Sequence, residues 1–91
     1  MSERMMRKSI HTKDYAEFLK LLIETRLQAG ITQVQLGNRL PFGQSGVSKI
    51  ERGERRVDVI ELRLICDRLN MDFLDFVQRL EARLSKGRGR D

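Results

Sequence analysis

The segment of residues 32–51, TQVQLGNRLPFGQSGVSKIE, most constrains how this chain can fold, because it predicts two short helices joined by a tight break. Leu36 and Leu40 are four residues apart and therefore share one face of the first helix. Gln35 follows Thr32 by three residues, which is the spacing of a capping box at the start of a helix. The segment therefore begins with a capped helix that has a single apolar face.

The Pro-Phe-Gly triplet at residues 41–43 interrupts the helical pattern, and the residues after it predict a second short helix. Val47 and Ile50, three residues apart, give this helix a narrow apolar stripe. Its other side chains are small, polar or basic: Gln44, Ser45, Gly46, Ser48 and Lys49. A helix with so few large residues on its outward side can lie in the major groove of DNA, where amides and hydroxyls contact base edges.

This ordered set of residues resembles the helix-turn-helix of the Cro/cI repressor family, also called XRE-like or lambda-repressor-like. The likeness runs without a gap from Thr-Gln at residues 32–33 to Val-Ser-Lys-Ile-Glu at residues 47–51, and continues into Arg-Gly-Glu-Arg-Arg at residues 52–56. Residues 15–77 fit the domain of that family without insertion. The resemblance implies an all-α, compact five-helix DNA-binding domain with its helix-turn-helix at the second and third helices.

Two residues of the break depart from the family pattern. Pro41 stands where many relatives have a left-handed glycine, a conformation that proline cannot adopt. Gly43 stands where a serine or another N-cap residue is common. The turn geometry is therefore left open by the sequence: the third helix lacks its usual side-chain cap, and Gly43 is the candidate for the left-handed position.

Composition agrees with a single all-α domain. The 91 residues carry a formal charge of +5 and a pI near 10, which suits a polyanionic partner, although solubility alone also explains many basic proteins.

Cys66 and His11 are the only cysteine and histidine, so we expect no disulfide, no metal site and no cofactor. The sequence shows neither a membrane-length apolar run nor a signal-peptide core, which predicts a cytoplasmic, nucleoid-associated protein.

The helical patterns divide the chain into three parts. Residues 1–13 are expected to form a flexible basic arm, residues 14–84 the helix-turn-helix domain, and residues 85–91 a disordered basic tail. The predicted helices cover residues 14–29, 33–40, 44–51, 58–69 and 72–84, with stops at Gly30 and Asn70. Asp58, with Glu61 three residues on, has the spacing of an acidic capping pair at the start of the fourth helix. Val59 and Val77 are expected in the core. Further apolar residues of the last two helices are either additional core or a surface for a second subunit: Ile60, Leu64, Leu74, Leu80 and Leu84.

The resemblance also implies roles for individual residues. Base reading falls to the outward side of the third helix, at Gln44, Ser45, Gly46 and Lys49. Phosphate binding falls to a set that includes the basic loop after that helix: Gln33, Ser48, Arg52, Arg55 and Arg56. Arg26 is expected to form an ion pair with Glu51 that ties the first helix to the end of the third; the alternative is that Arg26 extends into solvent.

The leading functional hypothesis is a bacterial or phage transcription regulator that binds a palindromic double-stranded operator as a homodimer. Repression is the commoner outcome, and prophage control proteins, restriction–modification controllers and antitoxins resemble the chain equally well; a toxin or co-regulator partner is left open. The second hypothesis is a protein-interaction module on the same fold, favoured by Gly46 and the Pro-Phe-Gly break. An enzyme is the weakest hypothesis, because one histidine and one cysteine suggest no nucleophile–base pair.

Overall fold

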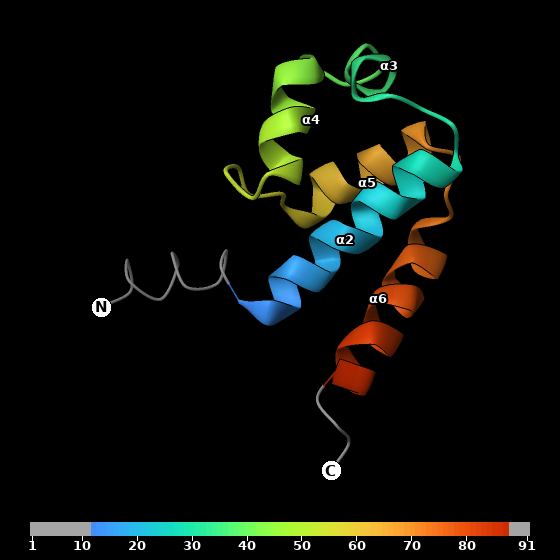
Figure 1. Cartoon of the computed structure of the whole chain (residues 1–91). Helices are drawn as coiled ribbons and strands as arrows, with labels where there is room; N and C mark the ends of the chain where they lie inside the picture. Colours follow the sequence, from blue (N-terminus) through green and yellow to red (C-terminus); the bar gives the residue numbers. More distant parts are fainter. Residues whose placement is uncertain (1–11, 88–91) are drawn as a thin grey trace.

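Five helices and no strand are present in residues 12–87, the part of the chain that the computed structural model describes (Figure 1). The helices are α2 (Lys13–Gln28), α3 (Gln33–Gly37), α4 (Gly43–Glu51), α5 (Val59–Arg68) and α6 (Phe73–Gly87). The all-α prediction is therefore confirmed. The long helix α2 packs against both α4 and α6, and α3 and α4 lie together at one end of the molecule, at the top of Figure 1.

The helical part of the chain extends further toward both termini than the sequence suggested. The Thr12 hydroxyl accepts a hydrogen bond from the Tyr15 amide at 3.1 Å, so Thr12 caps α2 and Lys13 belongs to the helix rather than to an arm. At the other end α6 continues to Gly87, so Ser85 and Lys86 are helical and not part of a disordered tail. The rest of the expected arm, residues 1–11, and of the expected tail, residues 88–91, lies outside the described residues.

Local signals set most helix ends. Capping boxes open α3 at Thr32 and α5 at Asp58, as the sequence predicted. α2 and α5 stop at Gly30 and Asn70, which have φ of 73° and 58°. Each stop is a Schellman motif, in which the amide of the left-handed residue and the amide after it donate hydrogen bonds to carbonyls of the last helical turn. α3 is shorter than expected: it ends at Gly37, and turns and a bend follow at residues 38–42.

Side chains from all five helices, and from the segments that directly follow α3 and α5, fill one core: Phe18, Leu21, Leu22, Leu36, Leu40, Val47, Ile50, Leu62, Ile65, Cys66, Leu69 and Phe76. The prediction was wrong for Val59 and Val77, which are 61% and 39% exposed. Val59 is the first residue of α5, and Val77 follows the fully buried Phe76 in α6, where consecutive side chains point in different directions. Leu64, Leu80 and Leu84 are half-buried, whereas Ile60 and Leu74 are exposed, so the surplus apolar residues divide between core and surface. None of the helices in residues 12–87 combines the length and apolar character needed to cross a membrane.

Candidate nucleic-acid interface

α3 and α4 cross so closely that only a glycine fits between them. A Cβ built on Gly37 would lie 2.3 Å from the backbone nitrogen of Gln44 and 2.6 Å from the carbonyl carbon of Gly43. The contact fixes the angle at which α4 leaves the turn, and hence the direction of its outward side.

The structure shows which residue of the turn between α3 and α4 adopts the left-handed conformation. Gly43 has φ of 69°, so it adopts the left-handed conformation that Pro41 cannot adopt. Phe42 stands at the N-cap position of α4, and no side chain there accepts a hydrogen bond from the helix. The first turn of α4 therefore keeps backbone amides without a side-chain cap.

Gly46 is not part of the outward side of α4, contrary to the sequence-based expectation that it reads bases. It is buried, and a Cβ at this position would lie 2.8 Å from Cδ2 and 2.9 Å from Cβ of Phe42. The physical reason is the turn: it brings the Phe42 ring back onto the first turn of α4, where the absence of a side chain makes room for it. Gly46 therefore supports the turn.

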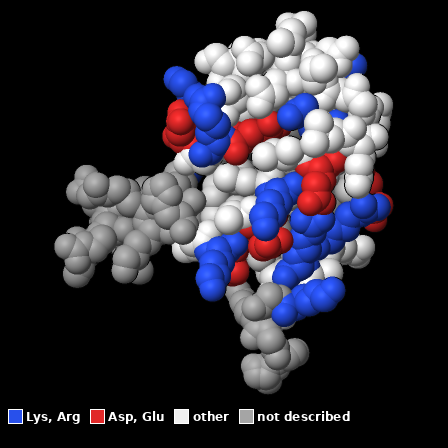
Figure 2. Space-filling view, in the orientation of Figure 1, with Lys and Arg blue, Asp and Glu red and all other residues white. Residues whose placement is uncertain are grey.

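The outward side of α4 carries the remaining candidates. Ser45, Ser48, Lys49 and Arg52 are spaced by three, one and three residues, so they form one helical stripe. Ser45, Lys49 and Arg52 are exposed and Ser48 is half-buried, while Gln44 is exposed at the N-terminal end of the same helix. Residues 27–50 contain no aspartate or glutamate. On the face shown in Figure 2, the end of the molecule formed by α3 and α4 is largely free of charged side chains.

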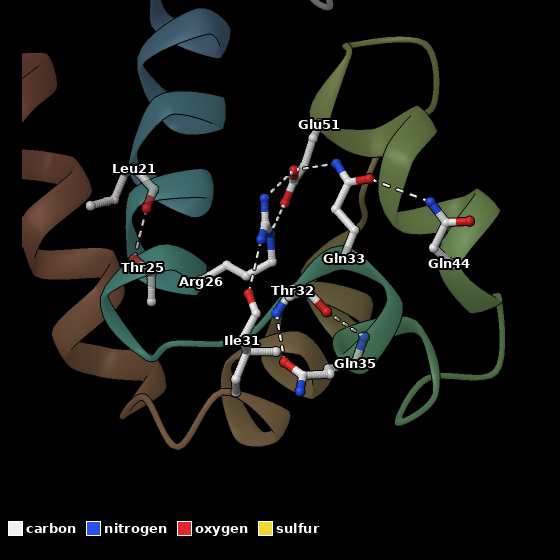
Figure 3. Close-up of polar contacts among 9 residues, drawn as sticks. All are labelled: Leu21, Thr25, Arg26, Ile31, Thr32, Gln33, Gln35, Gln44 and Glu51. Carbon is white, nitrogen blue, oxygen red and sulfur yellow. Dashed lines mark hydrogen bonds and ion pairs between the residues drawn. The ribbon is translucent and has the colours of Figure 1, made fainter.

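A chain of hydrogen bonds connects Gln44, at the N-terminal end of α4, to the interior (Figure 3). Gln44 Nε2 donates to Gln33 Oε1 at 3.4 Å, and Gln33 Nε2 donates to Glu51 Oε1 at 2.8 Å. Glu51 in turn accepts from Arg26, from Nε at 2.7 Å and from Nη2 at 3.0 Å. The Gln44 amide is thus held by a partner that is itself fixed to a buried carboxylate.

The Arg26–Glu51 pair is the ion pair that the resemblance implied, and Arg26 does not extend into solvent. The two side chains are only 9% and 6% exposed. Arg26 Nη1 also donates to the Ile31 carbonyl oxygen at 2.9 Å, in the link between α2 and α3. One guanidinium therefore joins three elements, because it lies in α2, binds the α2–α3 link and holds the last residue of α4.

Arg52 and Arg55, which follow α4, are paired with carboxylates. Arg52 donates to Glu54 from Nε at 3.0 Å and from Nη2 at 3.1 Å, and its Nη1 donates to the Ser48 hydroxyl. Arg55 donates from Nη2 to Glu61 at 3.0 Å. Figure 2 shows the same intermixing of basic and acidic side chains below the α3–α4 end of the molecule.

Arg55 has a second contact that the sequence did not suggest. Its Cζ lies 4.6 Å from the centroid of the Phe42 ring, close enough for a cation–π interaction. Phe42 therefore lies between Gly46 and Arg55, and it connects the turn before α4 to the loop after it. Arg56, the third arginine of the loop, is exposed.

A family model described as helix-turn-helix matches residues 22–76. A solved structure of an XRE-family like protein from Pseudomonas syringae pv. tomato str. DC3000 is similar over 85% of this chain and 94% of that chain, with 45% sequence identity and a TM-score of 0.75. A search of curated protein sequences gave no significant match.

Proposed function

We propose that this chain, which belongs to the XRE-type (Cro/cI-like) helix-turn-helix family of DNA-binding transcription regulators, reads a specific operator through the major groove with α4. The observation that carries the proposal is the position of Gln44. Its amide is exposed at the N-terminal end of α4 and is braced by Gln33. A braced glutamine can present its amide oxygen and nitrogen together to the N6 and N7 edge of an adenine.

Ser45 and Lys49 are the other base-reading residues that we propose. Both are exposed, and they lie one turn apart on the stripe that follows Gln44. A lysine in this position can donate to the O6 and N7 acceptors of guanine, and a serine can donate or accept. We leave Gly46 out of the proposed set because it is buried against Phe42.

Contacts with the DNA backbone would supply most of the sequence-independent affinity. We assign them to the half-buried Gln33 and Ser48 and to the exposed Arg52 and Arg56, which flank the base-reading stripe. Arg55 belongs to the same set, although in the free protein it is held by Glu61 and Phe42. These contacts fix the register of α4 on the duplex and leave the choice of sequence to Gln44 and its neighbours.

We further propose that the chain acts as a homodimer on a roughly palindromic site, most simply as a repressor that blocks polymerase. In that arrangement two copies of α4 enter successive major grooves about 34 Å apart. Exposed apolar residues on the last two helices, which include Ile60 and Leu74 at 72% and 67% exposure, offer the surface for the second copy. Sedimentation of the free protein and of its DNA complex measures the stoichiometry.

Selection of bound duplexes from a random pool tests the proposal, at roughly physiological salt so that non-specific phosphate binding is suppressed. We expect two enriched half-sites about one helical turn apart. Gln44→Ala should reduce discrimination against altered sites by roughly tenfold, consistent with about 1–3 kcal/mol for a bidentate base contact. Gln78→Ala, at an exposed glutamine of α6, is the matched control and should leave discrimination unchanged.

Arg52→Ala separates backbone contacts from base contacts in the same assay. It should weaken all duplexes similarly and reduce the slope of log affinity against log salt by about 0.9. If the folded protein enriches no sequence and binds duplexes without salt dependence, the proposal is wrong, and a protein-interaction module on the same fold replaces it.

A further inference from the structure

One exposed carboxylate stands beside the proposed DNA-binding side of α4. Between residues 27 and 57 the sequence contains only two acidic residues, Glu51 and Glu54. Glu51 is 6% exposed and is neutralised by Arg26, whereas the Glu54 side chain is 55% exposed. Among otherwise uncharged or basic residues, a solvent-facing carboxylate at this place opposes the approach of a polyanion.

Glu54 holds the arginine to which the proposed function assigns a phosphate contact. Its two carboxylate oxygens accept from Nε and Nη2 of Arg52 at 3.0 and 3.1 Å, which is the parallel geometry that an arginine also offers to a phosphate. The remaining terminal nitrogen, Nη1, donates to the Ser48 hydroxyl. All three nitrogens of the guanidinium therefore have partners in the free protein.

The backbone fixes Glu54 relative to α4. Gly53, with φ of 77°, reverses the chain after the helix. The Glu54 amide then donates to the Lys49 carbonyl at 2.8 Å and the Gly53 amide donates to the Ile50 carbonyl at 3.0 Å, which together form a Schellman motif. The carboxylate is consequently attached to the end of the helix rather than to a loose loop. Hydrogen bonds from Arg52 and its charge lower the pKa of Glu54, with a smaller contribution from Lys49, so the carboxylate is ionised at neutral pH.

We propose that Glu54 is a built-in competitor of DNA phosphate, whose carboxylate occupies Arg52 in the free protein and must be displaced before Arg52 can neutralise a phosphodiester. This inference rests on the proposed function and adds an autoinhibitory contact to it. Glu54 opposes every duplex alike, because phosphates are the same in all sequences. It therefore reduces the part of the binding free energy that comes from DNA-phosphate contacts, and it leaves the base contacts of Gln44 unaffected.

Glu54→Gln tests the competitor role in the whole 91-residue chain. Removing the charge should tighten binding to operator and random duplexes by a similar factor, roughly fivefold at about 0.15 M salt, and should steepen the salt slope by up to about 0.9. Glu81→Gln is the matched control, because Glu81 is exposed on α6 and accepts from the Ser85 hydroxyl at 2.7 Å. It changes net charge equally and should alter affinity less than twofold, roughly the effect of a distant, screened charge.

A double-mutant cycle shows whether Glu54 acts through Arg52. In an Arg52→Gln background, Glu54→Gln should change duplex affinity no more than Glu81→Gln does. The inference is overturned if Glu54→Gln tightens binding as strongly without Arg52, or if Glu81→Gln matches its effect in the otherwise native protein.

A readout without DNA keeps this inference distinct from the proposed function. Inorganic phosphate is titrated into the native protein and into the Glu54→Gln variant while the Arg52 Nε–H resonance is followed by NMR. The variant should respond at a several-fold lower phosphate concentration, since no carboxylate competes for the guanidinium. Equal responses would overturn the inference even if operator binding is demonstrated. If the variant responds at a lower phosphate concentration but the protein binds no DNA, the competition between Glu54 and phosphate for Arg52 is retained and the proposed regulatory function is rejected.

Discussion

Phe42 packs against Gly46 so closely that a single added methyl group would overlap it. A Cβ at Gly46 would lie 2.8 Å from Cδ2 and 2.9 Å from Cβ of Phe42, and the latter atom is too near the backbone to move aside freely. The same ring carries the Arg55 guanidinium at 4.6 Å. A glycine within the recognition helix is thus explained by the aromatic residue of the turn before it.

Gly46→Ala should lower the free energy of unfolding by about 1 kcal/mol, measured by urea denaturation. Overpacking against Phe42 costs about 1–3 kcal/mol, and alanine returns about 1 kcal/mol of helix propensity. The sign should reverse in a Phe42→Ala background, where the steric cost is gone and only the propensity gain is left. Stabilisation by Gly46→Ala in the otherwise native chain would contradict the packing described here.

Gly37→Ala should be more damaging, with a loss of about 3 kcal/mol or more. The clash at Gly37 involves the backbone nitrogen of Gln44 at 2.3 Å, and a backbone atom of the adjoining helix cannot rotate away as a ring can. Thermal unfolding of Gly37→Ala and Gly46→Ala under the same conditions gives the ranking. Equal losses would mean that α3 and α4 can separate at little cost.

Cys66 should be unreactive in the folded protein. Its side chain is fully buried, and burial, with a smaller contribution from the Asp72 carboxylate, raises the pKa of the thiol from 9.0 to about 11. Iodoacetamide at about pH 8 should therefore label the chain only after it unfolds in urea, because the thiolate is the nucleophile. Rapid labelling of the folded chain would contradict the burial.

The same group gives a pH dependence with a definite sign. A thiol whose pKa is raised by folding stabilises the folded state while it is protonated in both states. This contribution is complete below pH 9.0, the pKa of the thiol in the unfolded chain. It is lost as pH rises toward about 11, the pKa of the thiol in the folded protein. Cys66→Ser or Cys66→Ala should remove that step from the curve of unfolding free energy against pH.

The features that the sequence predicted correctly are those encoded within a few residues. Capping boxes at Thr32 and Asp58 and left-handed stops at Gly30 and Asn70 each depend on contacts across one helical turn. They define where α2, α3 and α5 begin or end without reference to the rest of the molecule. The ion pair between residues 26 and 51 is different, because the expectation came from the family resemblance and not from a local pattern.

The errors arise where the path of the backbone decides the outcome. Gly46 was expected on the outward side because its position was considered without the return of Phe42, which depends on the left-handed Gly43. The sequence also did not indicate which carboxylate Arg52 contacts. The turn at Gly53 brings Glu54 to Arg52, so Arg52 is paired in the free protein. Neither pairing has a sequence signature, since each depends on one backbone dihedral.

Breaking the Arg26–Glu51 pair should destabilise the fold and disorder Gln44 together. Arg26→Met leaves the 6%-exposed Glu51 carboxylate without its cation, and loss of one partner of a buried pair costs about 3–5 kcal/mol. Because Gln33 also donates to Glu51 at 2.8 Å and accepts from Gln44, the side-chain amide resonances of Gln33 and Gln44 should shift in NMR spectra.

Arg26→Met combined with Glu51→Leu separates the two effects. Removing both charges should recover much of the lost unfolding free energy, because two apolar side chains of similar volume replace a desolvated pair. The double variant should nevertheless discriminate operators less well than the native protein, since Gln33 has lost the carboxylate that orients it toward Gln44. Full recovery of stability with native discrimination would show that the pair serves the fold alone and that Gln44 needs no support from the interior.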